Sequence, residues 1–187
     1  MGDRRAVRTR AAIKQAFLTL LDTKTISKIT ILEITELANI GRGTFYLHYQ
    51  DIYALYEEIE KEMFERMDQL YDESFPIQDR RGVVHFIRKL TDYIYENRTL
   101  FRMLADPQNT LLTPNTFKDF FKTKVLQEIL TERALSRPPT VFEETESLFI
   151  VSGVFGVIQD WIERGMEEEP TGMSLRIEQL LLKLEEE

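Results

Sequence analysis

The chain has 187 residues, of which 43% are hydrophobic, and it carries a net charge of −8 with no cysteine. This length supports one or two small domains with a buried core, and the absence of thiols excludes disulfides and thiolate metal sites. The longest apolar run, residues 148–158, is interrupted by Ser152, Gly153 and Gly156. It is also much shorter than the roughly 20 residues that span a bilayer, so we expect no membrane helix.

The charge is distributed unevenly along the chain. Residues 1–49 hold eight basic and four acidic side chains, a balance of +4, which leaves −12 for residues 50–187. A basic end on an acidic body predicts a nucleic-acid-binding module joined to a second part, although an ordinary solvated surface can show the same imbalance. The N-terminal segment MGDRRAVRTR lacks an apolar run, so we expect no secretory leader and a cytoplasmic location.

The first expected elements are a loose basic arm, Met1–Arg8, and a helix that Thr9 caps and that continues to about Asp22. An apolar stripe at helical spacing supports this helix. Its members are Ala12, Ile13, Ala16, Phe17, Leu20 and Leu21. Lys24–Ile29 then reads as a linker.

The next segment has the pattern of a helix-turn-helix. Thr30 and Glu33 have the spacing of a capping box at a helix N-terminus. Asn39-Ile40-Gly41 ends this helix, because Asn and Gly best tolerate the left-handed backbone of a tight turn. A second short helix is expected from about Arg42 to His48. Such a pair of helices places its second member in the major groove of DNA.

Apolar spacing orients this second helix. Phe45 and Tyr49 lie four residues apart and are expected to point inward. The outward face then carries Arg42, Thr44, Leu47 and His48.

The remaining chain predicts helices only. A long amphipathic helix is expected from Asp51 to about Glu73, where it would link two parts of the molecule mechanically. Thr140 and Glu143 have the spacing of a second capping box, which opens a helix. Gly165 is suited to end that helix. The other expected helices are Arg80–Glu96, Arg98–Ala105, Thr113–Leu135 and one that begins at Ser174 after a turn at Pro170–Met173, with loops at Ser74–Asp79, Asp106–Leu112 and Ser136–Pro139. The fold class is therefore all-α.

The segment GRGTFYLHYQDIYAL resembles the recognition-helix signature of the TetR family of bacterial transcription regulators. Arg42, Gly43, Thr44, Phe45, Tyr46, His48 and Leu55 match that signature, and Tyr49 replaces its Phe. Asn39 replaces the usual turn Gly, Gly41 replaces a Ser, and Ile52 replaces a Lys that often touches phosphate. The resemblance covers about Thr9–Leu55. It implies a three-helix DNA-binding domain over residues 1–55 and a helical ligand-binding and dimerisation domain over residues 56–187.

The resemblance also implies contacts with double-stranded DNA at a near-palindromic operator. Arg42 and Thr44 would lie near base edges or phosphates, and Gly43 would allow close approach of the backbone. Leu47 would touch a thymine methyl or sugar edge, while Tyr46 and His48 would donate to phosphates. Fork-shaped arginine donors and short hydroxyls suit these partners. Tyr46 could instead belong partly to the core, and His48 could satisfy a local carbonyl.

Lys28 and Thr30 are weaker phosphate candidates at the start of the motif.

The helix expected at Thr140–Arg164 contains glycines that cost helix stability, about 1 kcal/mol each against Ala. A face without side chains allows close packing, and the resemblance implies that the last two helices form a homodimer interface. The residues assigned to it are Phe149, Ser152, Gly156, Gln159, Ile177, Leu181 and Leu184. Close packing within one chain is the alternative.

Large flexible and aromatic residues are frequent in the middle helices, where family members commonly hold a ligand. A pocket for a small apolar or aromatic effector would be lined by Phe64, Met67, Phe86, Tyr93, Phe101, Phe117, Phe121 and Trp161. The same spacing is equally compatible with an ordinary core. With only two histidines and no phosphate-binding glycine loop, we expect no enzyme activity, no cofactor and no metal.

The sequence therefore predicts a homodimeric TetR-like transcription regulator, most often a repressor in this family. The rival interpretation is a ligand- or protein-binding co-regulator that kept the scaffold and lost operator binding. Ile52, Gly41 and the modest charge of +4 motivate it. A helical bundle of another family is a third, more distant alternative.

Overall fold

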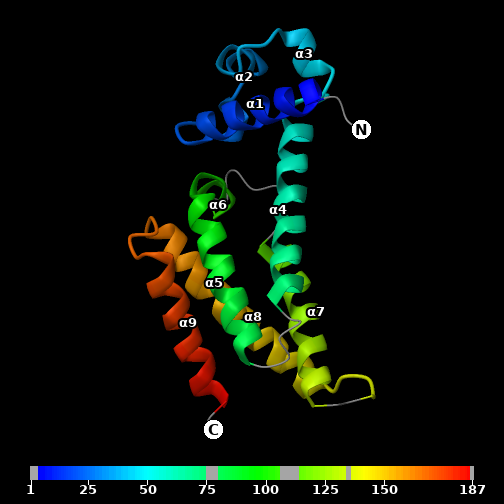
Figure 1. Ribbon diagram of the computed structural model, residues 1–187, viewed down its shortest axis with the longest axis vertical. Coiled ribbons are helices and arrows are strands. Elements are labelled where there is room, and N and C mark those ends of the chain that lie inside the picture. Colours follow the sequence, from blue (N-terminus) through cyan, green and yellow to red (C-terminus); the bar gives the residue numbers. More distant parts are fainter. Residues whose placement is uncertain (1–3, 75–79, 106–113, 134–135, 186–187) are drawn as a thin grey trace. The chain divides into compact units, whose positions relative to one another are not determined.

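The computed structural model describes residues 4–74, 80–105, 114–133 and 136–185. Within these ranges every regular element is a helix (Figure 1), which confirms the all-α fold class. The helices are α1 Arg4–Leu21, α2 Ile31–Leu37, α3 Arg42–Tyr46, α4 Ile52–Ser74, α5 Arg80–Glu96, α6 Arg98–Ala105, α7 Pro114–Glu132, α8 Val141–Glu163 and α9 Pro170–Glu185, with a single 3-10 turn at Ile26–Lys28. The expected loops at Asp106–Leu112 and at Phe75–Asp79 lie outside the described residues.

Two helices begin earlier than the sequence predicted. α1 starts at Arg4 and not at Thr9, whose hydroxyl donates to the carbonyl of Arg5 one turn back at 2.9 Å, as it does inside a helix. Most of the expected loose arm is therefore helical. α9 starts at Pro170, where a turn was expected, because the fixed φ of proline suits the first position of a helix.

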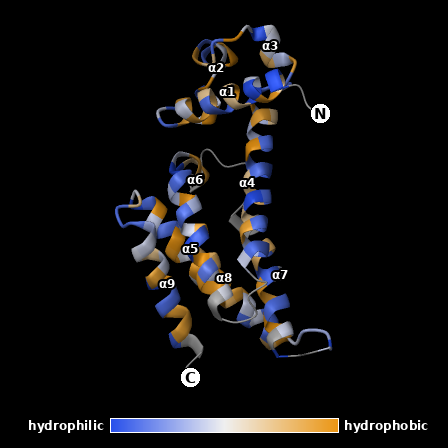
Figure 2. Cartoon of the chain, viewed as in Figure 1, coloured by the Kyte–Doolittle hydropathy of each residue, from blue (hydrophilic) through white to orange (hydrophobic). Residues whose placement is uncertain are grey.

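The chain divides into two compact units, and the division falls between Leu70 and Tyr71, inside α4. The sequence-based boundary after residue 55 marked the end of the expected DNA-binding motif. α4 thus contributes its first five turns to one unit and its last residues to the other. Figure 2 shows hydrophobic and hydrophilic residues alternating along its turns, the pattern of an amphipathic helix. As predicted, Asp51 caps α4, and its Oδ1 accepts from the Ala54 N–H at 2.8 Å.

The first unit is a small helical domain with its own core. α1 packs on α2, and α2 packs on α3. Fully buried side chains from each of these helices and from α4 meet in the core. They are Ile13, Phe17, Ile34, Phe45, Leu55 and Tyr56, all with an exposed fraction of 0%.

The second unit is a helical bundle in which α5 packs on α9, while α6 and α7 pack on α8. Its core includes Leu90, Ile94, Val151, Ile158 and Ile177. The predicted capping box opens α8. The hydroxyl of Thr140 accepts from the Glu143 N–H, and the Glu143 carboxylate accepts from the Thr140 N–H at 2.7 Å.

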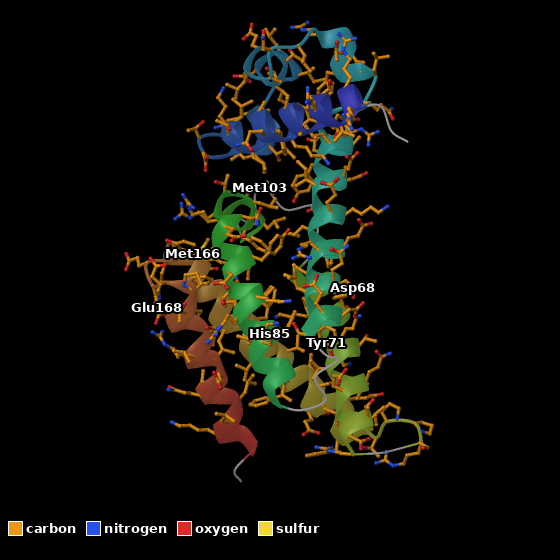
Figure 3. All side chains as sticks on the ribbon, viewed as in Figure 1. Asp68, Tyr71, His85, Met103, Met166 and Glu168 are labelled. Atoms are coloured by element: carbon orange, nitrogen blue, oxygen red, sulfur yellow. The ribbon has the colours of Figure 1, made fainter. Side chains whose placement is uncertain are left out.

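The turn between α8 and α9 is built as a helix C-cap. Gly165 has a φ of +81°, its N–H donates to Ile162, and the Met166 N–H donates to Trp161, both at 2.9 Å. These bonds define a Schellman motif and confirm the predicted role of Gly165. Figure 3 labels Met166 and Glu168 in this turn. The Glu168 carbonyl accepts from the Trp161 indole at 2.9 Å, which ties the turn to α8.

Candidate nucleic-acid interface

The turn between α2 and α3 fixes where α3 begins. Asn39 has a φ of +52°, its N–H donates to Glu36 at 3.1 Å, and the Ile40 N–H donates to Thr35 at 3.0 Å. This is a Schellman motif in which Asn takes the position that glycine usually occupies. Gly41, which the sequence grouped with Asn39 as a left-handed residue, has a φ of −77° instead. It is the N-cap of α3 and contributes no side-chain cap.

α3 has only five residues and depends on its anchors for stability. Phe45 is 0% exposed and Tyr49 is 3% exposed, which confirms that both point inward. Their ring centroids lie 5.8 Å apart, and the ring of Tyr46 packs edge-on against Phe45 at the same distance. The alternation of anchors and outward residues therefore presents one face of α3 to solvent.

The residues assigned to DNA contact lie on that exposed face. Leu47 is 83% exposed and Tyr46 is 57% exposed, which is unusual for side chains with so much apolar surface. Arg42 and Gly43 are exposed, and Thr44 and His48 are half-buried. Within the described residues Arg42 has no salt bridge. This surface combines an available guanidinium, a hydroxyl, an imidazole and an apolar tip, which are the groups that read a DNA groove.

The two weaker candidates precede α2 and differ from each other. Lys28 is exposed at the end of the 3-10 turn. Thr30 is exposed too, but its hydroxyl donates to Glu33 Oε2 at 2.8 Å and accepts from the Glu33 N–H. Hydrogen bonds from Lys24 and Thr30 lower the pKa of Glu33 to about 2. A carboxylate thus already occupies the N-terminus of α2, where a phosphate contact from Thr30 was predicted.

A polar cluster that the sequence reading did not identify joins α1, α4 and the segment after α3. Glu58 Oε1 on α4 accepts from Lys14 at 2.7 Å and from the Tyr49 hydroxyl at 3.2 Å, and it lies 3.8 Å from Arg10. Lys14 also pairs with Glu62 at 2.5 Å.

The contacts in this cluster shift the pKa values of Glu58 and Tyr49. Burial would raise the pKa of Glu58, but hydrogen bonds from Lys14 and Tyr49 and the nearby positive charges lower it. Burial and the charge of Glu58 raise the pKa of Tyr49. The signal in the sequence was Tyr49, which supplies a hydroxyl where the resembling signature has Phe.

The structure exposes some residues of the predicted dimer face and buries another. On α8, Phe149 is 63% exposed, Gly156 is exposed, and Ser152 and Gln159 are half-buried. They are more exposed than Val151, Ile158 and Ile162, which are buried on the same helix. A Cβ added at Gly156 would meet no atom within 4 Å, so intramolecular packing does not require this glycine.

On α9 one assignment was wrong. Ile177 is 1% exposed and belongs to the core of the second unit, because α9 turns Met173 and Ile177 toward its neighbours. Among the described side chains of α9, the large apolar ones that are exposed are Leu175 and Leu180, at 45% and 46%, and the sequence-based prediction did not select them. Leu181 is half-buried. The side chain of Leu184 lies outside the described residues.

Several of the residues assigned to an effector pocket pack against one another in pairs. Phe86 contacts Phe121 with ring centroids 5.7 Å apart, and Tyr93 contacts Phe101 at the same distance. Trp161 stacks on Tyr95 instead, at 6.3 Å, so it belongs to the junction with the α8–α9 turn. Phe64 and Met67 lie in the first unit, and the side chain of Phe117 is outside the described residues. The pocket stays a prediction.

Over the described ranges no three His, Asp or Glu side chains gather as metal ligands. None of the helices in the described ranges is both long and apolar enough to cross a membrane.

The exposed face of α3, the buried anchors and the helical second unit define the class of helix-turn-helix regulators. Residues 83–183 match the TetR-type family model described as the transcriptional regulator C-terminal region. That match covers more than half of the chain, which therefore belongs to the TetR family of transcriptional regulators.

Similar proteins agree with this assignment. The uncharacterised HTH-type transcriptional regulator YxbF of Bacillus subtilis is 23% identical over 177 residues, which cover 91% of this chain and 44% of the relative. The chain thus spans less than half the length of that curated relative.

Two solved structures share the fold. NalD, the secondary repressor of the MexAB-OprM multidrug efflux pump in Pseudomonas aeruginosa, gives a TM-score of 0.72 at 18% identity and 97% coverage of both chains. The dihydroxyacetone kinase operon activator DhaS gives 0.63 at 19% identity, covering 94% of this chain and 95% of its own.

Proposed function

We propose that this protein is a homodimeric DNA-binding regulator that represses transcription until a small apolar or aromatic effector releases it from a near-palindromic operator. The exposed face of α3 is the observation that carries the DNA-binding part of this proposal. Phe45 and Tyr49 are buried, whereas Arg42 and Leu47 are exposed and have no role in the core that would account for their identity. Repression and effector release are taken from what is typical of the family.

The mechanism follows from a dimer with two such faces. Each α3 would enter one of two successive major grooves, whose centres lie about 34–36 Å apart. Arg42 would donate to a base edge or phosphate, and Leu47 would contact a thymine methyl. An effector bound in the second unit would displace α4, and the two α3 helices would then no longer match the groove spacing.

The dimer part of the proposal is supported by the outward side of α8 and α9. Phe149 and Leu180 are large apolar side chains left exposed in a single chain, and exposed apolar patches mark interaction surfaces. Val141 and Phe142 extend the same exposed side to the start of α8, at 80% and 72% exposure. A second copy of the chain that covers this side would remove these residues from water.

The first test is Arg42→Ala, measured as binding to a duplex that the wild-type protein selects from a random DNA pool. Loss of one bidentate contact costs about 1–3 kcal/mol, and the proposed homodimer loses one in each groove, so affinity should fall by about thirtyfold or more. Arg88→Ala, which removes an exposed arginine from α5, is the matched control and should bind normally. Unchanged binding by Arg42→Ala would remove α3 as the contact. Failure of the wild type to select any duplex would favour the co-regulator interpretation.

A further inference from the structure

The first two turns of α1 form a basic surface that the α3 interface does not include. Residues 4–10 read RRAVRTR, with four arginines and no acidic residue, in a chain whose net charge is −8. Arg4 and Arg8 lie one helical turn apart and are both exposed. The core side of α1 is instead defined by Ile13, Ala16 and Phe17.

The ion pairs of α1 distinguish its basic residues. Arg10 and Lys14 face Glu58 and Glu62, so their charge is largely offset inside the first unit. Arg4 and Arg8 have no salt bridge among the described residues. Their positive charge is therefore available to a partner, and the positive end of the α1 dipole adds to it.

The Glu58 cluster also fixes where this basic surface lies. Arg10 and Tyr49 reach the same Glu58 oxygen, at 3.8 and 3.2 Å, so this part of α1 is held close to the segment that follows α3. Arg4 lies six residues before Arg10, which is about 9 Å along a helix. Each strand of DNA carries a phosphate about every 3.4 Å of helix axis. A duplex that meets α3 would thus bring phosphates within reach of the start of α1.

We propose that Arg4 and Arg8 of α1 bind DNA phosphates beside the groove that α3 enters, as a second contact that adds affinity without reading sequence. This proposal rests on the DNA-binding function proposed above. The contact would also offset the substitution of Ile52, which is half-buried where related signatures place a phosphate-binding Lys.

The test measures how DNA affinity depends on salt for the full-length double variant Arg4→Ala/Arg8→Ala. The probes are the duplex selected by the wild type and a scrambled duplex of the same composition. Each phosphate contact contributes about 0.9 to the slope of log affinity against log salt. The double variant removes two contacts from each protomer of the proposed homodimer, so the slope should fall by about 3.6. Affinity for both duplexes should fall by the same factor, because phosphates carry no sequence information.

Two further variants sharpen the result. Arg4→Lys/Arg8→Lys keeps both charges and should recover most of the slope. Lys61→Ala/Arg88→Ala removes two exposed charges from α4 and α5 and should keep the wild-type slope. A wild-type slope in Arg4→Ala/Arg8→Ala, with normal binding, would overturn the proposal. A loss confined to the selected duplex would overturn its sequence-independent character. A wild type that binds neither duplex would instead refute the proposed function, and this contact with it.

Discussion

The hydroxyl of Tyr49 gives this position a contact that a phenylalanine would lack. Its ring packs on Phe45 as a phenylalanine would, while its hydroxyl adds a bond to Glu58 on α4. That bond, together with Lys14, makes the position after α3 part of a contact among three elements. The residue therefore both anchors α3 and sets its direction relative to the start of α4.

Tyr49→Phe should lower the free energy of unfolding by about 1 kcal/mol, the usual net value of one hydrogen bond. The phenyl ring keeps the packing, so the loss isolates the hydroxyl. Urea unfolding followed by circular dichroism measures it. Tyr53→Phe removes the hydroxyl of an exposed tyrosine on α4 and should have no effect. Equal stability of Tyr49→Phe and the wild type would show that the bond contributes nothing net.

At the scale of elements, helix ends determine most of the architecture. α2 and α8 both begin with a Thr-x-x-Glu capping box, and both end in a Schellman motif. At α8 the cap is reinforced by Arg137, whose guanidinium donates to the two Glu143 oxygens at 2.8 and 2.9 Å. These bonds from Arg137 and Thr140 lower the pKa of Glu143 from 4.5 to about 2.

This lowered pKa predicts the pH dependence of stability. A carboxyl with a depressed folded-state pKa stabilises the protein above its unfolded-state pKa, and the stabilisation is lost as the pH falls toward the folded-state value. Glu143→Gln should therefore be less stable than the wild type above pH 4.5. The gap, which is the difference in free energy of unfolding between the two proteins, should narrow between pH 4.5 and 2. Urea unfolding at a series of pH values measures the gap.

Glu144→Gln changes an exposed carboxylate in the same turn and should leave the pH dependence of the wild type in place. If the gap between Glu143→Gln and the wild type were constant over this pH range, the stabilisation would not come from the charge of Glu143.

At the scale of the whole molecule, one side of α8 is exposed to solvent in the part of the chain that the structure describes, and Phe149 on this side is 63% exposed. Gly156 lies on this side, and the space around it is open in a single chain. A substitution at Gly156 can therefore test the dimer interface, because a larger side chain can be added there without a clash inside the monomer.

Gly156→Leu should convert dimers to monomers, as measured by sedimentation at micromolar concentration. Thermal unfolding of the monomer should not suffer, since replacing a helical glycine removes a cost of about 1 kcal/mol. Asp92→Leu adds the same side chain at an exposed site on α5 and should stay dimeric. An intact Gly156→Leu dimer would move the interface away from this part of α8.

Local patterns in the sequence were sufficient to predict most of the fold. Capping boxes, Gly165 and the breaks around α5 and α6 depend on neighbouring residues, so their positions can be read directly. The inward anchors of α3 followed from spacing alone. Ile177 was misplaced because spacing identifies an apolar stripe but not which neighbour covers it. The Glu58 cluster was missed because its partners lie up to 48 positions apart in the chain.

The short α3 has a consequence for how such a regulator can change over evolution. Its stability rests on Phe45 and Tyr49, while Arg42 and Leu47 contribute almost nothing to the core. Mutations at the outward positions are therefore nearly free of any penalty in folding. A few substitutions on one helical face can therefore redirect the same scaffold to a new set of genes. Each intermediate variant along the way would remain stably folded.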